Sequence, residues 1–352
     1  MSRPFTTGQL ASLIGAICEG DPNRVVSGVS TLERATVDDL AFCSGGRWRR
    51  ALPGTKAGAV VVDDGDVPEG VVALRHSRPR FAYAQAARAM FPVEWPEPGI
   101  HPQACVDPTA DVDPTATVGP FAVVAAGASI GPGSWVQAHA YVGRGAVVGE
   151  GSRLFPTAVL MDRCVVGDRV RLQPGAVVGG DGFGYAVGPD GLAPVPQLGI
   201  AVIADDVDVG VNSCVDRAAL DETVIGPGTR LDNLVQIAHG VRTGASCLLA
   251  AFAAVSGGSK LGDRVIMAGR TAITEHVTVG DDAVFVGMTA TSRDVGAGAR
   301  IGGSPARPYG QWAREQVALR RLPGALRTLD GLAAKVREIS EALKQTSSSE
   351  EH

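Results

Sequence analysis

The feature that most constrains this chain is an aliphatic residue at every sixth position. The series covers residues 100–178 without exception, in fourteen consecutive Val, Ile or Leu residues. It stops over residues 179–202 and then continues over 203–285, with one slip of four residues near 216–220. A period of six fits neither an α-helix nor an alternating strand, but it is typical of the hexapeptide parallel β-helix. We therefore expect a mainly β protein with such a β-helix over residues 100–307.

Three hexapeptides would close one triangular coil of 18 residues, and successive coils would stack about 4.8 Å apart through parallel strand hydrogen bonds. Glycine often follows the aliphatic residue, as at Gly143 and Gly149. We expect these glycines at corners that need unusual backbone angles. The period itself does not determine the hand of the coil.

Both flanks of the series differ from it. Residues 1–99 contain short β-like runs and an amphipathic stretch at 80–90, which together predict a small α/β domain. Residues 308–352 lose the six-residue period and acquire helical spacing of leucines, which predicts a C-terminal helical extension. Three domains are therefore expected, with the β-helix between the other two.

Composition excludes several function classes. A formal net charge of -5 argues against a nucleic-acid-binding protein, which would need a basic surface. The six cysteines include no C-x-x-C pair, so neither a zinc finger nor a disulfide framework is indicated. No apolar signal core and no run of about 20 apolar residues occurs. We expect a cytoplasmic protein with reduced thiols.

Histidine spacing suggests where chemistry could lie. His239 follows the inward Ile237 by two residues, Gly257 lies one coil of 18 residues further on, and a second coil reaches Glu275 beside His276. Regular stacking would bring His239, Gly257 and His276 onto one edge of the β-helix, within about 10 Å. A neutral imidazole and a peptide N–H on one edge suit acyl transfer, as base and oxyanion donor.

Two other interpretations remain open at this point. The histidines could be corner residues with solvated rings. A three-histidine zinc site is the other, as in hexapeptide proteins of the gamma carbonic anhydrase type. That family has a close pair of histidines, this chain has none, and His139 is remote in coil number, so we expect no metal.

Three motifs carry a resemblance to a known family. They are Gly-Asp-Gly-Phe-Gly-Tyr-Ala at 180–186, Asp-Arg-Ala-Ala-Leu-Asp-Glu-Thr at 216–223, and Asp-Asn-Leu-Val-Gln-Ile-Ala-His at 232–239. With the three-part layout, the whole chain resembles the UDP-3-O-acylglucosamine N-acyltransferases of lipid A synthesis. The resemblance implies a left-handed β-helix and an N-terminal uridine-binding domain. It also implies transfer of a 3-hydroxyacyl group from acyl carrier protein to the 2-amino group of UDP-3-O-(3-hydroxyacyl)glucosamine.

The same resemblance implies residue roles. His239 would be the general base, Asp232 the carboxylate that orients it, and Gly257 the oxyanion donor. The residues implied in substrate binding are His276, Phe42, Trp48, Asn233, Gln236, Asp181, Phe183 and Tyr185. Phe42 and Trp48 would stack on uracil, but Gly45 stands where the family has an Asn, which puts the uracil hydrogen bonds in question.

The C-terminal segment is consistent with the implied donor. Residues 307–345 contain eight Lys or Arg against four acidic residues. This positive net charge suits contact with an acidic carrier protein. No cofactor is expected beyond the 4'-phosphopantetheine arm of the carrier. The family also implies a homotrimer with sites between neighbouring chains. Side chains near Ala272 and Ala290 would set the depth of the acyl pocket.

Two alternatives to this function are kept. One is an acetyl-CoA-dependent nucleotide-sugar N-acetyltransferase of the hexapeptide class. The other is a non-enzymatic β-helix scaffold that binds nucleotide-sugars through the domain containing Phe42 and Trp48.

Overall fold

The structure is a computed structural model that describes residues 2–303 and 308–349, with Arg47 and residues 341–349 described by their backbone only. The chain divides into two compact units, Met1–Pro96 and Glu97–His352. The second unit contains the β-helix and the C-terminal helix α3 (Tyr309–Ser349). Each unit is described by itself below.

The first unit is a small α/β domain. Its five-stranded sheet has the order β2-β7-β6-β5-β4, and helices α1 and α2 supply buried residues to the apolar core on one face. The predicted β-like runs and the predicted helix at 80–90 are confirmed, whereas α1 and β2 were not expected. The elements are β1 (Phe5–Thr6), α1 (Thr7–Ile14), β2 (Ile17–Glu19), β3 (Val25–Val26), β4 (Gly28–Val29), β5 (Asp39–Cys43), β6 (Ala59–Val62), β7 (Val72–Arg75) and α2 (Pro79–Met90), with 3-10 turns at Gly46–Arg50 and Leu52–Gly54.

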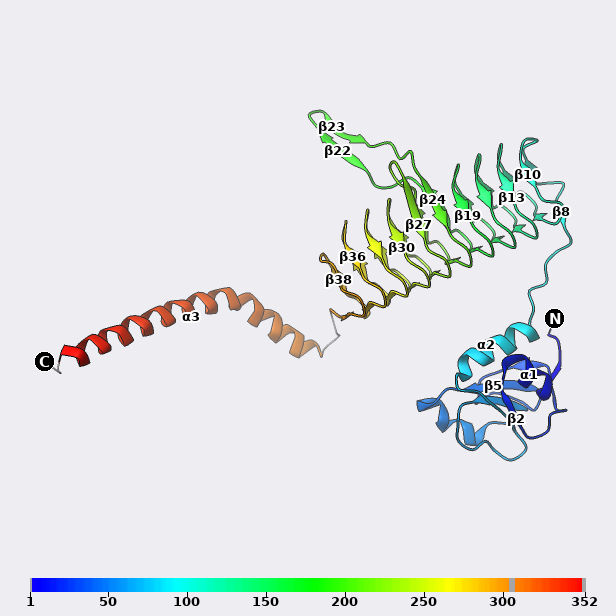
Figure 1. Ribbon diagram of the computed structural model, residues 1–352, viewed down its shortest axis with the longest axis horizontal. Coiled ribbons are helices and arrows are strands. Elements are labelled where there is room, and N and C mark those ends of the chain that lie inside the picture. The colour runs from blue at the N-terminus through cyan, green and yellow to red at the C-terminus, as the bar shows by residue number, and fades with distance from the viewer. Residues whose placement is uncertain (1, 304–307, 350–352) are drawn as a thin grey trace. The chain divides into compact units, whose positions relative to one another are not determined.

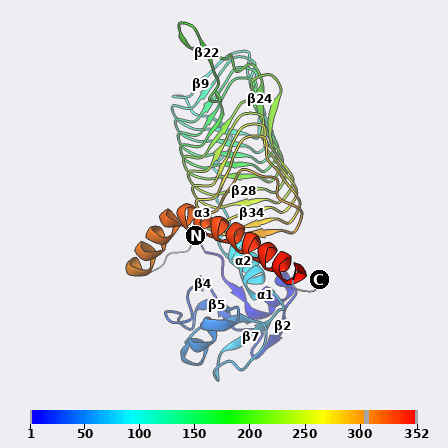
Figure 2. The same cartoon turned by 90° about the vertical axis from the view of Figure 1, so that its left-hand side faces the viewer.

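The second unit begins with a parallel β-helix of three sheets, which Figures 1 and 2 show as a stack of coils. The sheets contain eleven, ten and nine strands in the described part of the chain, and consecutive strands of the chain fall in different sheets. Nearly every strand is two residues long, from β8 (Gly99–Ile100) to β20 (Arg171–Leu172) and from β28 (Arg230–Leu231) to β39 (Arg300–Ile301). The exceptions are β21 (Val177–Gly180), β24 (Ile200–Ile203), β26 (Cys214–Asp216) and β27 (Glu222–Ile225).

Strand register confirms the 18-residue coil. Val118 pairs with Val136, and the same spacing holds through the coils that end at Val178. Across the break in the series, Val166 pairs with Ile203, an offset of 37 residues, so the break adds 19 residues to one coil. At the slip, Val215 pairs with Ile237, an offset of 22, so four residues are added. Both irregularities therefore lie outside an unbroken stack.

The core of the β-helix is the predicted aliphatic series. Its members are fully buried from Val118 to Phe285, and small residues such as Ala140 and Ala158 fill the space beside them. Thr243 is the one polar member of the series. Its hydroxyl oxygen accepts a hydrogen bond from the Gly226 amide at 2.9 Å, which satisfies a polar group that burial would otherwise leave costly.

The predicted reason for the corner glycines is wrong. Gly143 and Gly149, which directly follow the aliphatic residue, do not have positive φ. They are required because the next coil approaches closely: a Cβ at Gly143 would lie 2.5 Å from the amide nitrogen of Asp162. The left-handed residue comes two positions later, as at Gly145 and Arg163, with φ of 60° and 63°.

The 19 added residues leave the coil and form a hairpin of β22 (Tyr185–Gly188) and β23 (Gly191–Pro194). Figure 1 shows this hairpin projecting from the coils. Its side chains are exposed and largely apolar; Phe183 just before it is 86% exposed.

Helix α3 confirms the predicted C-terminal helix and contains Pro323. Its aliphatic side chains are exposed, among them Leu326, Leu329 and Leu332. Within residues 2–303 and 308–349, no helix combines the length and the apolar content that a membrane crossing requires.

Candidate active site

The predicted chemistry lies along one corner of the β-helix. This corner follows the strands of the ten-stranded sheet, among them β29 (Gln236–Ile237), β32 (Ala254–Val255) and β35 (Ala272–Ile273). We call the second residue beyond each buried strand residue the corner row. From one coil to the next, the row reads Arg144, Asp162, Gly180, Arg217, His239, Gly257 and Glu275.

The imidazole of His239 lies against two glycines. A Cβ at Gly257 would lie 2.7 Å from the Cε1 atom and 2.8 Å from the Nε2 atom of His239. On the other side, a Cβ at Gly182 would lie 2.7 Å from the His239 Cβ and 3.0 Å from its Cδ2 atom. Any larger residue at either position would displace the ring. The two glycines therefore fix the place of the imidazole by close packing.

The amide of Gly257 is open at this corner. Elsewhere in the same row, the Arg144 N–H donates to the Asp162 carboxylate of the next coil at 2.9 Å. The residue one coil beyond Gly257 is Glu275, and across residues 2–303 and 308–349 no oxygen accepts a hydrogen bond from the Gly257 N–H. A donor beside the imidazole is thus available to a reacting oxygen.

His276 lies one coil further along, at the residue after the corner row. It has a left-handed φ of 59°, and its N–H donates to the Gly257 carbonyl at 3.0 Å. A Cβ at Gly258 would lie 2.5 Å from the His276 Nδ1 atom. The two imidazoles therefore lie two coils apart, one on each side of the coil that contains Gly257 and Gly258, as the 18-residue spacing predicts.

Asp216 is a carboxylate that sequence reasoning did not single out. It follows Val215, which pairs with Ile237, so it lies one coil from His239 at the same corner. Gln236 donates to it from Nε2 at 2.8 Å. Burial raises the pKa of the Asp216 carboxyl, while the Gln236 hydrogen bond and the positive charge of a protonated His239 oppose that rise and the charge of Asp181 adds to it. Its only sequence signal is membership of the 216–223 motif.

Asp232 and Asn233 lie at a different corner, beyond β28. The Asp232 carboxylate accepts the Asn233 N–H at 2.8 Å and the Ala251 N–H at 3.1 Å, and the Asn233 side chain accepts the Val211 N–H at 2.8 Å. Both side chains thus satisfy backbone amides. Within this chain the structure does not bring Asp232 against His239.

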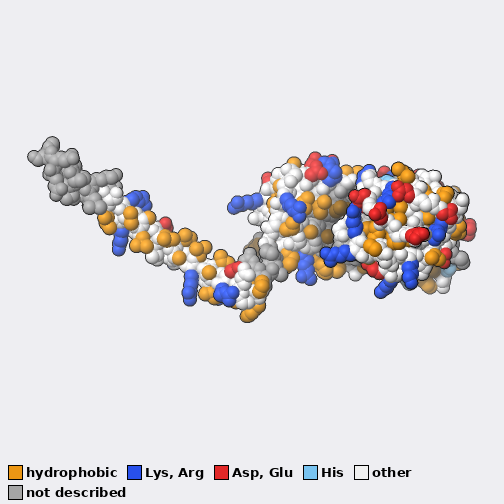
Figure 3. Space-filling view, turned by 90° about the horizontal axis from the view of Figure 1, so that it is seen from below, with side chains coloured by type: hydrophobic (Ala, Val, Ile, Leu, Met, Phe, Trp, Pro, Cys, Tyr) orange, Lys and Arg blue, Asp and Glu red, His pale blue; other side chains and the backbone are white. Residues whose placement is uncertain are grey.

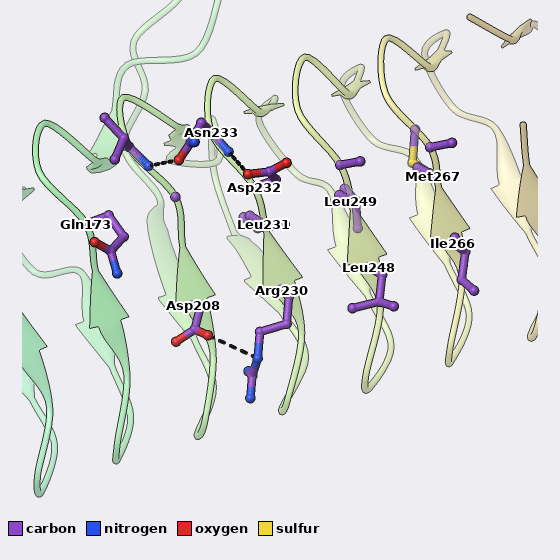
Figure 4. A pocket seen from close by; sticks show the side chains of 14 residues that line it. Gln173, Asp208, Arg230, Leu231, Asp232, Asn233, Leu248, Leu249, Ile266 and Met267 are labelled. Carbon is purple, nitrogen blue, oxygen red and sulfur yellow. Dashed lines mark hydrogen bonds and ion pairs between the residues drawn. The ribbon is translucent and has the colours of Figure 1, made fainter. Parts of the chain in front are cut away.

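Asp232 and Asn233 line a groove of about 590 Å³, which Figure 4 shows from close by. One end is polar, where Arg230 forms an ion pair with Asp208 at 3.1 Å. The other end is apolar and is formed by residues such as Leu248 and Ile266. The groove runs across five successive coils of the eleven-stranded sheet.

The loop 179–185 contributes the remaining predicted residues beside His239. Asp181 forms an ion pair with Arg217 at 3.7 Å, and Phe183 and Tyr185 meet edge to face with ring centroids 5.1 Å apart. Both aromatic side chains are exposed. Gly182, between them and Asp181, is the residue that touches the imidazole.

A pocket in the first unit contains the predicted aromatic pair. It has a volume of about 270 Å³ and is lined by Phe42, Trp48, Tyr83, Leu32 and the consecutive residues Ser30 and Thr31. Phe42 also contacts Tyr83, with ring centroids 4.6 Å apart. Burial raises the pKa of the Tyr83 hydroxyl. Tyr83, Ser30 and Thr31 were missed, because nothing in their local sequence marks them as pocket residues.

Across the described ranges, 2–303 and 308–349, no group of three His, Cys, Asp or Glu side chains is placed to hold a metal ion. The chemistry that this arrangement of residues can perform is that of an imidazole base next to a free amide donor.

Comparison with known proteins gives matches over most of the chain. Residues 23–89 match the family model described as UDP-3-O-(3-hydroxymyristoyl) glucosamine N-acyltransferase, LpxD, and residues 145–180 match bacterial transferase hexapeptide (six repeats). A UDP-3-O-acylglucosamine N-acyltransferase from an Anaeromyxobacter species is 44% identical over 91% of this chain and 93% of its own length. The protein of that name from Granulibacter bethesdensis is 47% identical over 91% and 95%, respectively.

Among solved structures, the UDP-N-acetylglucosamine acyltransferase of Arabidopsis has a TM-score of 0.53. It is 21% identical, and the match covers 58% of this chain and 71% of that one. The likeness concerns the fold alone, which is the left-handed parallel β-helix. The expected fold class and hand are thereby confirmed.

Proposed function

The chain belongs to the UDP-3-O-acylglucosamine N-acyltransferase family, and we propose that His239 is the general base of its reaction. The acyl donor in this proposal is a 3-hydroxyacyl thioester on the 4'-phosphopantetheine arm of acyl carrier protein. The acceptor is the 2-amino group of UDP-3-O-(3-hydroxyacyl)glucosamine. No resident cofactor takes part.

The reaction then follows from the geometry of the corner. The amine nitrogen attacks the thioester carbon, and the carbonyl oxygen becomes an oxyanion that accepts the Gly257 N–H. His239 takes the proton released from the nitrogen. As the C–N bond forms and the C–S bond breaks, the phosphopantetheine thiolate leaves and takes up a proton. His276, one coil beyond Gly257, would contact the substrate beside this centre.

The observation that carries this proposal is the pairing of an imidazole with an uncapped amide. A solvated corner histidine would need neither Gly182 nor Gly257 packed on its ring. The Gly257 N–H, which no oxygen of the described residues accepts, lies next to the ring and supplies the donor that the reaction needs. A preorganised donor of this kind contributes about 10²–10³ to turnover in acyl transfer.

A homotrimer would place Asp232 in the site. Within one chain this residue lies at another corner, so we infer that the Asp232, Asn233 and Gln173 surface of one copy faces His239 of a neighbour. The outward residues of the ten-stranded sheet are consistent with association. Asp216 is the charged one among the outward residues of the described strands, and those that precede the buried residue, from Cys105, Val123 and Tyr141 through Cys214 to Ala272 and Ala290, are uncharged, as is typical of interface cores. Gln236, in the same outward row, remains available to substrate.

The nucleotide would bind in the pocket of the first unit. Phe42, Trp48 and Tyr83 offer aromatic faces to a uracil ring. The family Asn is replaced by Gly45, which has a left-handed φ of 65° and no side chain to offer. Ser30 and Thr31 line the same pocket, and we propose that their hydroxyl or backbone groups supply the hydrogen bonds instead.

Helix α3 is proposed to contact the carrier protein. Its described part bears six basic side chains (Arg314, Arg320, Arg321, Arg327, Lys335, Arg337) against three acidic ones (Glu315, Asp330, Glu338). Figure 3 shows basic and apolar side chains along this helix with few acidic ones. Arg307 and the side chains of Glu341 and Lys344 lie outside the described residues. A basic surface would attract an acidic carrier.

A donor comparison tests the function. The full-length protein is assayed with UDP-3-O-(3-hydroxyacyl)glucosamine and either 3-hydroxyacyl carrier proteins of several chain lengths or acetyl-CoA. We expect N-acylated product with a long-chain carrier donor and little with acetyl-CoA. Product with acetyl-CoA alone would favour the N-acetyltransferase alternative, and binding without any product would favour the scaffold alternative.

A further inference from the structure

Arg217 is a buried cation one coil before His239 in the corner row. Its side chain is 9% exposed, and arginine is almost never buried without partners. The Nε atom donates to the Gly179 carbonyl at 2.7 Å and the NH2 group donates to the Asp162 carbonyl at 3.2 Å. Its backbone N–H donates to the Gly180 carbonyl at 2.8 Å. The bonds to Gly179 and Gly180 are made where the chain leaves the coil. The bond to Asp162 is made one coil earlier.

The point of departure is itself tightly packed. Gly179 has a left-handed φ of 90°, and a Cβ there would lie 2.2 Å from the Cys164 Sγ atom. The chain then turns outward through Gly180 and Asp181, whose carboxylate lies 3.7 Å from the Arg217 guanidinium. The next residue is Gly182, which packs on the His239 ring. Arg217 thus holds the three residues that precede the contact with the imidazole.

A second arginine holds the other end of the excursion. The Arg163 NH2 group donates to the Leu198 carbonyl at 2.8 Å, where the chain returns to the coil. Arg163 is more exposed than Arg217, and its hydrogen bond lies at the returning end of the excursion and not at Gly182. Between the two ends, Gln197 packs on both Gly182 and Gly184, so the loop lies on the coil surface at its base. The hydrogen bonds of Arg217 are made at the end of the excursion that covers the histidine, next to the close packing of Gly179 on Cys164.

We propose that Arg217 is a positioning residue that holds the 179–185 loop over His239. It touches neither the imidazole nor, in the proposed reaction, the reacting atoms. Its planar fork binds two carbonyls and a carboxylate at once, which a lysine ammonium cannot match in geometry. With the loop held, Gly182 confines the half-buried imidazole against Gly257; with the loop released, the ring would gain freedom and become more exposed to solvent.

The test uses full-length Arg217→Met and Arg217→Lys proteins beside the wild type. Arg264→Met is the matched control, because Arg264 is also an arginine of the β-helix, paired with Asp282 at 2.8 Å but far from the loop in the chain. The first readout is the rate at which diethyl pyrocarbonate modifies His239, followed by peptide mass spectrometry, with His139 as internal reference. The second is kcat and KM in the acyl-transfer assay.

Arg217→Met is expected to raise the His239 modification rate several-fold and to lower kcat about 10- to 100-fold, with KM changed little. Arg217→Lys should fall between Met and wild type, and Arg264→Met should match wild type. If Arg217→Met does not fold, Arg217→Lys decides. Wild-type His239 reactivity in the folded Arg217 variants would overturn the proposal, even if kcat had fallen.

The kinetic readout rests on the proposed function, but the modification rate does not. A wild-type protein without acyl transfer would contradict the proposed function alone. The modification rate of His239 in the Arg217 variants would still decide whether Arg217 holds the loop.

Discussion

Two places in the corner row, one at Arg144 and one at Gly257, have the same backbone path but different surroundings. In the regular coils, the Arg144 amide is closed by the carboxylate of Asp162 in the next coil. Two coils beyond Arg217, the Gly257 amide is left open and the imidazole of His239 lies against it. The two places differ in what lies against the amide: a carboxylate at Arg144, and at Gly257 an imidazole beside an open N–H.

The interruptions of the coil affect the second place only. The 19 added residues bring Gly182 onto His239, and the four added residues bring Asp216 and Arg217 beside it. The coils from Val118 to Val178 have no added residue and no such contacts. Regular stacking supplies rigidity, and each insertion supplies a group that a hexapeptide lacks.

Among the glycine substitutions at this corner, the largest effect is predicted for Gly257, where a side chain would fill the space beside the open amide. In Gly257→Ala, the added Cβ would overlap the His239 ring, so the imidazole and the oxyanion donor would no longer be aligned. We expect kcat to fall by about 10²–10³ or more, with little loss of stability. Gly296→Ala is the control, because no atom lies within 4 Å of its added Cβ. Comparable activity in the two variants would contradict the assignment of Gly257.

A smaller effect, on stability and not on turnover, is predicted for Gly143, which precedes Arg144 of the corner row in a regular coil. In Gly143→Ala, the new Cβ would lie 2.5 Å from the Asp162 amide nitrogen, so neighbouring coils must separate locally. We expect a loss of about 1–3 kcal/mol in the free energy of unfolding. Turnover per folded molecule should stay near wild type. A large loss of turnover in Gly143→Ala at full stability would show that the regular coils also affect the reaction directly.

The smallest predicted effect concerns Asp216. Because burial raises the pKa of its carboxyl, the folded chain holds this proton more tightly than the unfolded chain does. This contribution favours folding below the unfolded pKa and is lost as pH rises through the folded pKa. Asp216→Asn, which keeps an oxygen for Gln236, should therefore be the more stable protein at pH 7, within about 1 kcal/mol.

Thermal unfolding at pH 7 and at pH 4 checks the Asp216 prediction. The advantage of Asp216→Asn over wild type should shrink toward the lower pH, as the wild-type carboxyl becomes neutral. A variant less stable than wild type at pH 7 would mean that the charged carboxylate is a net stabilising group here.

Much of the fold was predictable because the β-helix is periodic. An inward residue every six positions fixes which side chains are buried, and 18 residues per coil fix which residues are neighbours. His239, Gly257 and His276 could therefore be placed together from their spacing alone. The hand of the coil had to come from resemblance, since inward burial is the same for either hand.

The rest of the site could not be predicted because it depends on the two inserted segments, which do not follow the six-residue period. An insertion has no period, so nothing in the spacing shows that Gly182 returns to the imidazole or that Arg217 is buried. The role of the corner glycines was misjudged for a related reason. The period locates a corner but does not distinguish a left-handed φ, as at Gly145, from a close approach, as at Gly143.

The most direct test of this account is turnover by His239→Gln, measured with a 3-hydroxyacyl carrier protein and UDP-3-O-(3-hydroxyacyl)glucosamine. We predict a fall in kcat of about 10²–10⁴ with the melting temperature and the substrate KM values unchanged, because a base is lost while the coil stays intact. A folded variant that keeps kcat within about tenfold of wild type would contradict the role of His239.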